Sequence, residues 1–362
     1  MTTTTTTTTK RETPYTLARQ TCAQLLAHAD KFHLPVRVNA NAAADLRNSL
    51  DVSFVQDFGA SLAQNANFTG LTGCDFGSNN NESAVDCEAA WIVLTHAVDF
   101  GSGWRRALHQ HHGKGAWLTI KPGIEALFRL AQAQQATHLP AAWLQGLTHA
   151  HVATAFGLPP QEGGNDELNL LVEYLVVALH DLGRGAERYE SLQALVKGTL
   201  KQVAMSATPA GDFVWMLVDV FPTTFNDRYM LFKTQEVCFY KKAQLVTGEL
   251  YHRFRNQDER FAFADGSQLT AYIDNVIVAS LRYKKVVVPN DALTEAIETG
   301  LEIPSGSVEE VSLRAAAMCG VEAVVQGTPL PSCELGNYLW AGLGKEPNVR
   351  KFARHATKTI FY

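Results

Sequence analysis

The chain has 362 residues, of which 46% are hydrophobic, and it carries a formal net charge of −5 at pH 7. This composition is sufficient for a large buried core, and the mild net acidity argues against broad electrostatic binding to a nucleic-acid backbone. The six cysteines are dispersed without a C-x-x-C pair, and the histidines lack companion ligands at a metal-binding spacing. We therefore expect reduced thiols, a cytoplasmic protein and no metal site.

The N-terminal segment, residues 1–12, begins with Met and eight threonines and has no apolar stretch. It matches neither a signal peptide nor a membrane anchor, and we expect a disordered tail. No apolar run further along approaches the length of a membrane-spanning helix. The sequence therefore predicts one folded unit over residues 13–362, without a membrane partner.

Helical periodicity dominates the rest of the chain. Helices are predicted over residues 15–28, 41–50, 52–66, 124–134, 141–155, 166–182, 189–204 and 236–255, then from a capping box at 307–310 and from a cap at Ser332. Residues 67–86 are predicted as a loop, and the buried run at 213–221 fits either a helix or a strand. Strong strand character is confined to short runs at 262–263 and 286–288, and residues 36–39 are predicted as a short extended or turn segment. We predict an all-α fold with little or no sheet.

One carboxylate, Asp274, stands inside an apolar run over residues 270–278. The capping-box spacing at 265–268 predicts a helix that begins there and carries Asp274 in its middle, on an apolar face. A carboxylate in such a place is costly unless it is neutralised, paired or used. Asp274 is therefore either a catalytic acid or a structural side chain held by a cation or a helix N-terminus.

A second cluster lies in the first turns of the helix predicted over residues 236–255. Tyr240, Lys241 and Lys242 are consecutive there. The N-terminal end of a helix attracts anions, so a phosphate bound at this end would offset the unfavourable placement of two lysines. The alternative is a solvated basic face.

A third cluster is formed by Glu334, Asn337 and Tyr338, which share one face of the helix predicted after Ser332. A carboxylate, an amide and a phenol together suit the edge of a polar heterocycle or a cationic amine. Glu334 is explained almost as well as a helix cap. The chain contains no P-loop, Rossmann glycine pattern, G-x-S-x-G or H-E-x-x-H motif, so Mg²⁺-dependent nucleotide hydrolysis and cofactor redox chemistry have no support.

Taken together, several segments resemble the queuosine salvage family, the queuosine 5′-phosphate N-glycosylases. The matching segments are residues 98–104, 236–244 and 269–274, the pattern Glu334-x-x-Asn337-x-Leu339-Trp340, and the ending His355-x-Thr357-x-Thr359-x-Phe361-Tyr362. The resemblance implies an all-α fold related to helix-hairpin-helix DNA glycosylases. It also implies hydrolysis of queuosine 5′-monophosphate to queuine and ribose 5-phosphate, without metal or cofactor.

Asp274 matches the catalytic Asp of that family, and a carboxylate there would stabilise the positive charge that develops on the ribose. The other residues expected to bind substrate are Phe100 and Trp104 for stacking on the base, Asn337, Tyr338 and Glu334 for its polar edges and ammonium group, and Tyr240, Lys241 and Lys242 for the phosphate. We expect a monomer that acts on this small molecule without contacting nucleic acid directly.

Two alternatives come from other classes of protein. A DNA-base glycosylase on a related helical scaffold is disfavoured by the net acidity and by the lack of a Gly-rich hairpin that would grip duplex phosphate. A helical protein that binds a nucleobase without catalysis is separated from the enzyme by product analysis.

Overall fold

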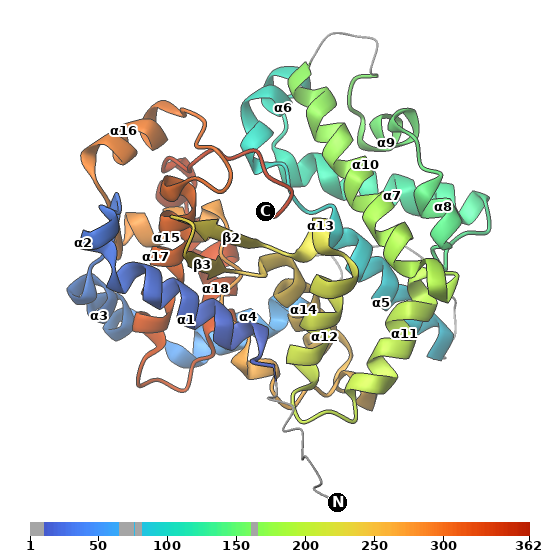
Figure 1. Ribbon diagram of the computed structural model, residues 1–362, viewed down its shortest axis with the longest axis horizontal. Coiled ribbons are helices and arrows are strands. Elements are labelled where there is room, and N and C mark those ends of the chain that lie inside the picture. The colour runs from blue at the N-terminus through green and yellow to red at the C-terminus, as the bar shows by residue number, and fades with distance from the viewer. Residues whose placement is uncertain (1–10, 65–75, 77–81, 161–165) are drawn as a thin grey trace, which may run out of the picture.

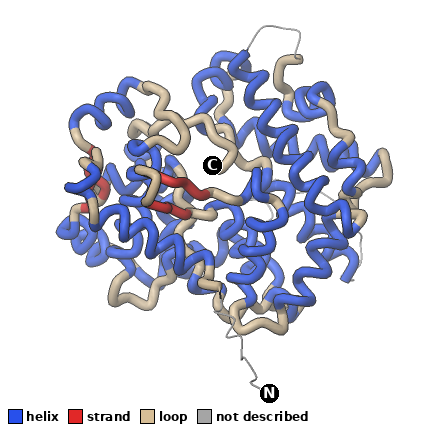
Figure 2. The backbone as a smooth tube through the Cα atoms, in the orientation of Figure 1, coloured by secondary structure: helices blue, strands red, loops and turns tan. Residues whose placement is uncertain are grey.

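The computed structural model describes residues 11–64, 76, 82–160 and 166–362. Helices build most of this part, and the strands shown in Figure 2 are few and short. The predicted all-α fold is therefore confirmed, whereas the likeness to helix-hairpin-helix DNA glycosylases stays a prediction. Across the described ranges, no helix is both long enough and apolar enough to cross a bilayer.

The first of two hydrophobic cores lies on the side of the molecule drawn in green and cyan in Figure 1. Its elements are α5 (Glu82–Ala97), η1 (Ser102–Trp104), α6 (Arg105–His112), α7 (Ala116–Ala133), α8 (Ala141–Gln145), α9 (His149–Phe156), α10 (Asp166–Ala186), η2 (Glu187–Tyr189), α11 (Leu192–Val203), α12 (Pro209–Val220), α13 (Pro222–Phe225), α14 (Lys241–Phe254), η3 (Glu259–Phe261) and η4 (Gly266–Gln268). Helix α10 packs against α8, α9, α11 and α13, as expected for a predominantly apolar central helix.

The second core joins the two ends of the chain, drawn in blue and in orange to red. Its elements are α1 (Pro14–Ala27), α2 (Ala29–Phe32), β1 (Val36–Val38), α3 (Ala40–Ser49), α4 (Val52–Gln64), β2 (Arg228–Leu231), β3 (Gln235–Cys238), α15 (Asn275–Tyr283), β4 (Val287–Pro289), α16 (Asp291–Thr299), α17 (Val308–Val325), α18 (Ser332–Asn337), η5 (Tyr338–Gly342), η6 (Leu343–Lys345) and α19 (Pro347–Lys351). Strand β1 pairs antiparallel with β4, and β2 pairs antiparallel with β3.

Several predicted boundaries were wrong because pairing or capping by distant residues decides them. The helix predicted over 236–255 begins only at Lys241, because residues 235–238 form β3 against β2. The helix predicted over 141–155 is split into α8 and α9, and Thr148 caps the second. Ser332 does not cap α18, because its hydroxyl donates to Glu322 at 2.8 Å. Residues 262–263 form no strand, and the ambiguous run at 213–221 belongs to helix α12.

Part of the predicted tail and loop, residues 1–10, 65–75 and 77–81, lies outside the described residues. Arg11 and Glu12, which the sequence assigned to the tail, pack on α12. Arg11 makes a two-pronged ion pair with Asp219 and lies 3.3 Å from the centre of the Trp215 ring, whose indole N–H donates to the Glu12 carbonyl.

A buried ionic network connects the two cores. Arg314 of α17 is fully buried and donates to Asp227, which follows α13, with an Nη1–Oδ1 distance of 3.0 Å. The same guanidinium reaches Glu310 at 3.3 Å, and Glu310 accepts a hydrogen bond from the C-terminal Tyr362 at 3.0 Å. Because all three charged groups lie out of water, each depends on the others for compensation.

Candidate active site

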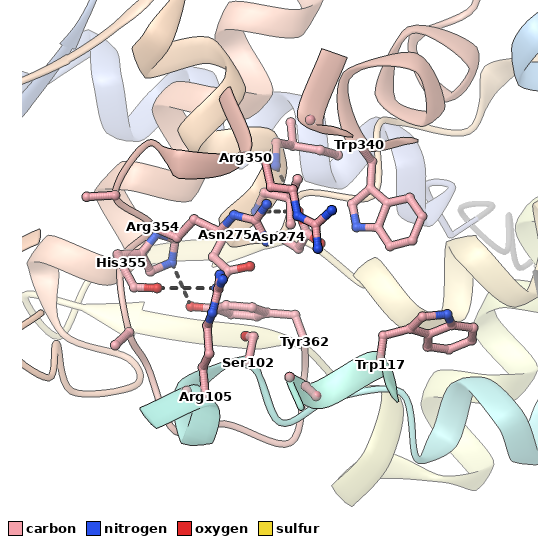
Figure 3. A pocket seen from close by; sticks show the side chains of 18 of the residues that line it. Ser102, Arg105, Trp117, Asp274, Asn275, Trp340, Arg350, Arg354, His355 and Tyr362 are labelled. Atoms are coloured by element: carbon pink, nitrogen blue, oxygen red, sulfur yellow. Dashed lines mark hydrogen bonds between the residues drawn. The ribbon is translucent and has the colours of Figure 1, made fainter. Parts of the chain in front are cut away.

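A cavity of about 1790 Å³ opens between the two cores. Its walls come from segments that are far apart in the sequence: residues 99–118, the first turns of α14 and α15, residues 297–302 and the C-terminal region from residue 336. Figure 3 labels side chains from residues 99–118, from the start of α15 and from the C-terminal region around the cavity. No single segment forms the site, so it exists only in the folded chain.

Asp274 lines this cavity, but the prediction that it lies in the middle of a helix was wrong. Residues 266–268 form only the short turn η4, residues 269–274 are not helical, and α15 begins at Asn275. The expected cap, Asp265, is used elsewhere: its carboxylate accepts hydrogen bonds from Ala210 and Gly211 at the start of α12, at 2.8 and 3.1 Å. The sequence pattern thus marked a cap correctly but assigned it to the wrong helix.

Asp274 is itself the N-cap of α15. Its Oδ1 accepts hydrogen bonds from the backbone N–H groups of Val276 and Ile277, both at 2.9 Å. Its Oδ2 accepts no hydrogen bond from the described residues. Burial raises the pKa of Asp274 above its ordinary value, against the opposing effects of Lys241, Arg354 and the two N–H groups. The result is a desolvated carboxylate with one oxygen committed to the fold and one available to a ligand.

Lys241 connects Asp274 to a buried chain of alternating charges. Its Nζ lies 3.8 Å from Asp99 Oδ2, and the same oxygen lies 3.9 Å from His96 Nδ1. His96 Nε2 in turn contacts Glu249 Oε2 at 2.5 Å. Burial alone would disfavour charge on His96, but Glu249 and Asp99 outweigh it and raise its pKa. Lys241 therefore stands between two carboxylates, Asp99 and Asp274, rather than at an open anion site.

The neighbours of Lys241 do not reach the cavity. Lys242 is 1% exposed, and its ammonium donates to the carbonyl oxygens of Ala97 and Ile360 at 2.6 and 2.8 Å. Tyr240 is buried against the ring of Trp215. Adjacent residues on a helix point in different directions, and of these three only Lys241 faces the cavity. We therefore drop the expected phosphate role of Tyr240 and Lys242.

Of the two residues expected to stack on the base, only one lines the cavity. Phe100 lines the cavity, whereas Trp104 is fully buried, packs edge-on against Tyr174 and does not line it. Trp104 is the last residue of the three-residue turn η1, and its ring lies in the first core. Trp104 is thus a packing residue.

The cluster on α18 is divided in the same way. Asn337 lines the cavity, but Glu334 and Tyr338 do not. Helix α18 packs against α4, where Tyr338 contacts the rings of Phe54 and Phe58 edge-on. Burial raises the pKa of Glu334 to about 7, with Arg255 and Asp57 as its charged neighbours. Tyr338, the first residue of η5, therefore packs on α4, and Glu334 lies outside the cavity.

The cavity residues that the sequence interpretation missed include two tryptophans and three arginines: Trp117, Trp340, Arg105, Arg350 and Arg354. The indoles of Trp117 and Trp340 come from α7 and η5, on different walls of the cavity in Figure 3. Trp340 lay inside a matched segment, and the run of basic residues over 345–358 was the available signal for the C-terminal arginines.

The C-terminal segment, residues 353–362, is held against the cavity by backbone contacts. Arg282 donates to the Ala353 carbonyl at 2.9 Å, and Asn275 donates to the His355 carbonyl at 3.3 Å. At Gly103 a Cβ atom would lie 2.1 Å from the Thr357 oxygen, so only glycine permits this approach. This contact brings the start of α6 beside the C-terminal segment.

The fold and the cavity define an all-helical protein whose pocket combines a desolvated carboxylate with a group of cations, and therefore suits a small anionic molecule. The model of the family described as "Queuosine salvage protein" matches residues 85–362, and the chain belongs to this family. All the cavity-lining segments fall within the match. The resemblance that the sequence indicated is thus confirmed.

Two curated relatives carry the name "Queuosine 5′-phosphate N-glycosylase/hydrolase". The protein from Sphaerobacter thermophilus is 29% identical over 279 residues, which cover 76% of this chain and 81% of the relative. The protein from Dictyostelium discoideum is 31% identical over 170 residues, which cover 46% of this chain and about half, 52%, of the relative.

Proposed function

We propose that this protein hydrolyses the N-glycosidic bond of queuosine 5′-monophosphate and releases queuine and ribose 5-phosphate, so that queuine is salvaged for tRNA. The single observation that carries the proposal is Asp274: a buried carboxylate with an available oxygen, in the pocket of a chain that belongs to the queuosine salvage family.

In the proposed reaction, the bond between the base nitrogen and C1′ of the ribose breaks and its electron pair leaves with the base. Positive charge develops on the ribose, and the ionised Asp274 stabilises it from a site of low polarity. The oxygen of one water molecule is added to C1′, and its two protons are distributed between the new hydroxyl and the departing base. The same carboxylate is suited to act as a nucleophile, a base or an electrostatic stabiliser.

Several residues that line the cavity are suited to contact the base. Leu245 lies one helical turn beyond Lys241, and with Phe100, Tyr272 and Asn337 it lines the cavity. The Asn337 amide offers both a donor and an acceptor to a guanine-like edge. Asp99 lines the cavity and Glu334 does not, so Asp99 is the better candidate to bind the ammonium of the queuine side arm.

Incubation of the purified protein with queuosine 5′-monophosphate, followed by mass analysis, tests the proposal. We expect queuine and ribose 5-phosphate in equal amounts. Tight binding of queuine with no cleavage would instead support the non-catalytic nucleobase-binding protein. Duplex DNA binding that weakens steeply with salt would support the DNA-base glycosylase.

Substitution of Lys241 by Met should move the acid limb of the pH profile of kcat/KM to higher pH. Asp274 acts as a carboxylate, and Lys241 is the strongest of the groups that lower its pKa against burial. Loss of this cation raises the pKa further, so activity disappears at a higher pH as acid is added. Lys114→Met, which removes a cavity-lining cation that does not act on Asp274, should leave the limb in place. An unshifted limb in Lys241→Met would contradict the coupling.

A further inference from the structure

Three arginines gather at one end of the cavity without a carboxylate partner. Arg105 opens α6, Arg350 lies in α19, and Arg354 follows α19 in the C-terminal segment. Within the described part of the chain, none of the three makes an ion pair or a side-chain hydrogen bond. Figure 3 shows all three around the same space as Asp274.

Arg105 and Arg350 lie close enough to Arg354 to disfavour its charge. Burial lowers the pKa of Arg354, Asp274 opposes this effect, and Arg105 and Arg350 both add to it. Arg105 and Arg350 are exposed, and Arg354 is half-buried. Like charges placed near one another repel, and a bound anion relieves this repulsion.

Apart from Asp274, the carboxylates that line the cavity have other cations beside them. Glu167 and Glu302 are both bound by Lys358, at 3.0 and 2.9 Å. Glu298 stabilises the charged form of Arg282 and so opposes the lowering of its pKa by burial. Asp99 lies beside Lys241 and His96. Asp274 is the carboxylate that favours the charged form of Arg354, although the two side chains form no ion pair.

We propose that Arg105, Arg350 and Arg354 bind the 5′-phosphate of the substrate and make the enzyme selective for the nucleotide over the nucleoside; this inference rests on the proposed function. A guanidinium donates two parallel hydrogen bonds to a phosphate, which a lysine cannot do. Asp274 and the three arginines line the same cavity, so a ribose with C1′ at Asp274 can present its 5′-phosphate to the arginines. This assignment replaces the phosphate role expected of Lys241 and Lys242.

The test compares Arg105→Gln, Arg350→Gln and Arg354→Gln on queuosine 5′-monophosphate and on queuosine, at a pH above the acid limb. We expect kcat/KM for the monophosphate to fall about 10- to 100-fold in each variant, as for loss of hydrogen bonds to a charged group. Turnover of queuosine should stay close to that of the parent protein. Arg37→Gln, an exposed arginine on β1 away from the cavity, is the matched control and should change neither value. Equal losses on both substrates, or a selective loss in Lys241→Met alone, would overturn the proposal.

A binding measurement separates failure of this inference from failure of the proposed function. Calorimetry with ribose 5-phosphate, and with ribose as the uncharged control, needs no catalysis. We expect binding of ribose 5-phosphate that weakens with salt and is weakened by Arg350→Gln, with Arg350→Lys intermediate. If the protein cleaves no queuosine 5′-monophosphate but binds ribose 5-phosphate in this way, the anion site is supported and the proposed reaction is refuted. If ribose 5-phosphate binds no better than ribose, the anion site is refuted.

Discussion

Asp274→Asn should reduce queuine release by about 10³-fold while the protein keeps its fold, because removing one preorganised electrostatic group from a site has an effect of this order. The amide has nearly the shape of the carboxylate but not its charge, so it cannot compensate a cationic ribose. The measurement is kcat under saturating queuosine 5′-monophosphate, together with the melting temperature.

Asparagine is the informative replacement because Asp274 has two roles. Its Oδ1 caps α15 through two backbone N–H groups. Asparagine is as good an N-cap as aspartate, whereas Asp274→Ala would also cost about 1 kcal/mol of stability. A reduced rate in Asp274→Asn with an unchanged melting temperature therefore assigns the loss to the missing charge. Undiminished turnover in that variant would remove Asp274 from the mechanism.

The free energy of unfolding should fall by about 3–5 kcal/mol in Arg314→Met, because this variant leaves two carboxylates buried without their cation. Asp227 and Glu310 are at most 1% exposed, and both are bound by this guanidinium. Burial already raises the pKa of Glu310, with Arg314 the main opposing group. Chemical denaturation followed by circular dichroism gives the change.

Arg37→Met serves as the control for this prediction. Arg37 is exposed on β1, so its loss should change stability by no more than about 0.5 kcal/mol. Because Glu310 also binds Tyr362, the Arg314 variant should loosen the C-terminal segment as well. A stability equal to that of the control would show that the network contributes little to the fold.

The fate of two neighbouring lysines shows why the site was only partly predictable. Lys241 and Lys242 are equivalent by sequence, yet one faces the cavity and the other is fixed by two carbonyl oxygens from distant segments. Nothing local distinguishes them. The arginines of the proposed phosphate site come from residues 105, 350 and 354, which meet because Gly103 packs against the backbone of Thr357.

The sequence by itself determined the helical class, most of the helices and the family, and it singled out Asp274 as the candidate catalytic acid, because periodicity, caps and short motifs are local signals. Tertiary structure decided that Asp265 caps α12, so that the chain stays non-helical up to Asp274 and α15 begins there. It also decided which polar side chains face the cavity. Such choices depend on partners distant in the sequence, whose burial and hydrogen bonding exist only once the two cores have come together.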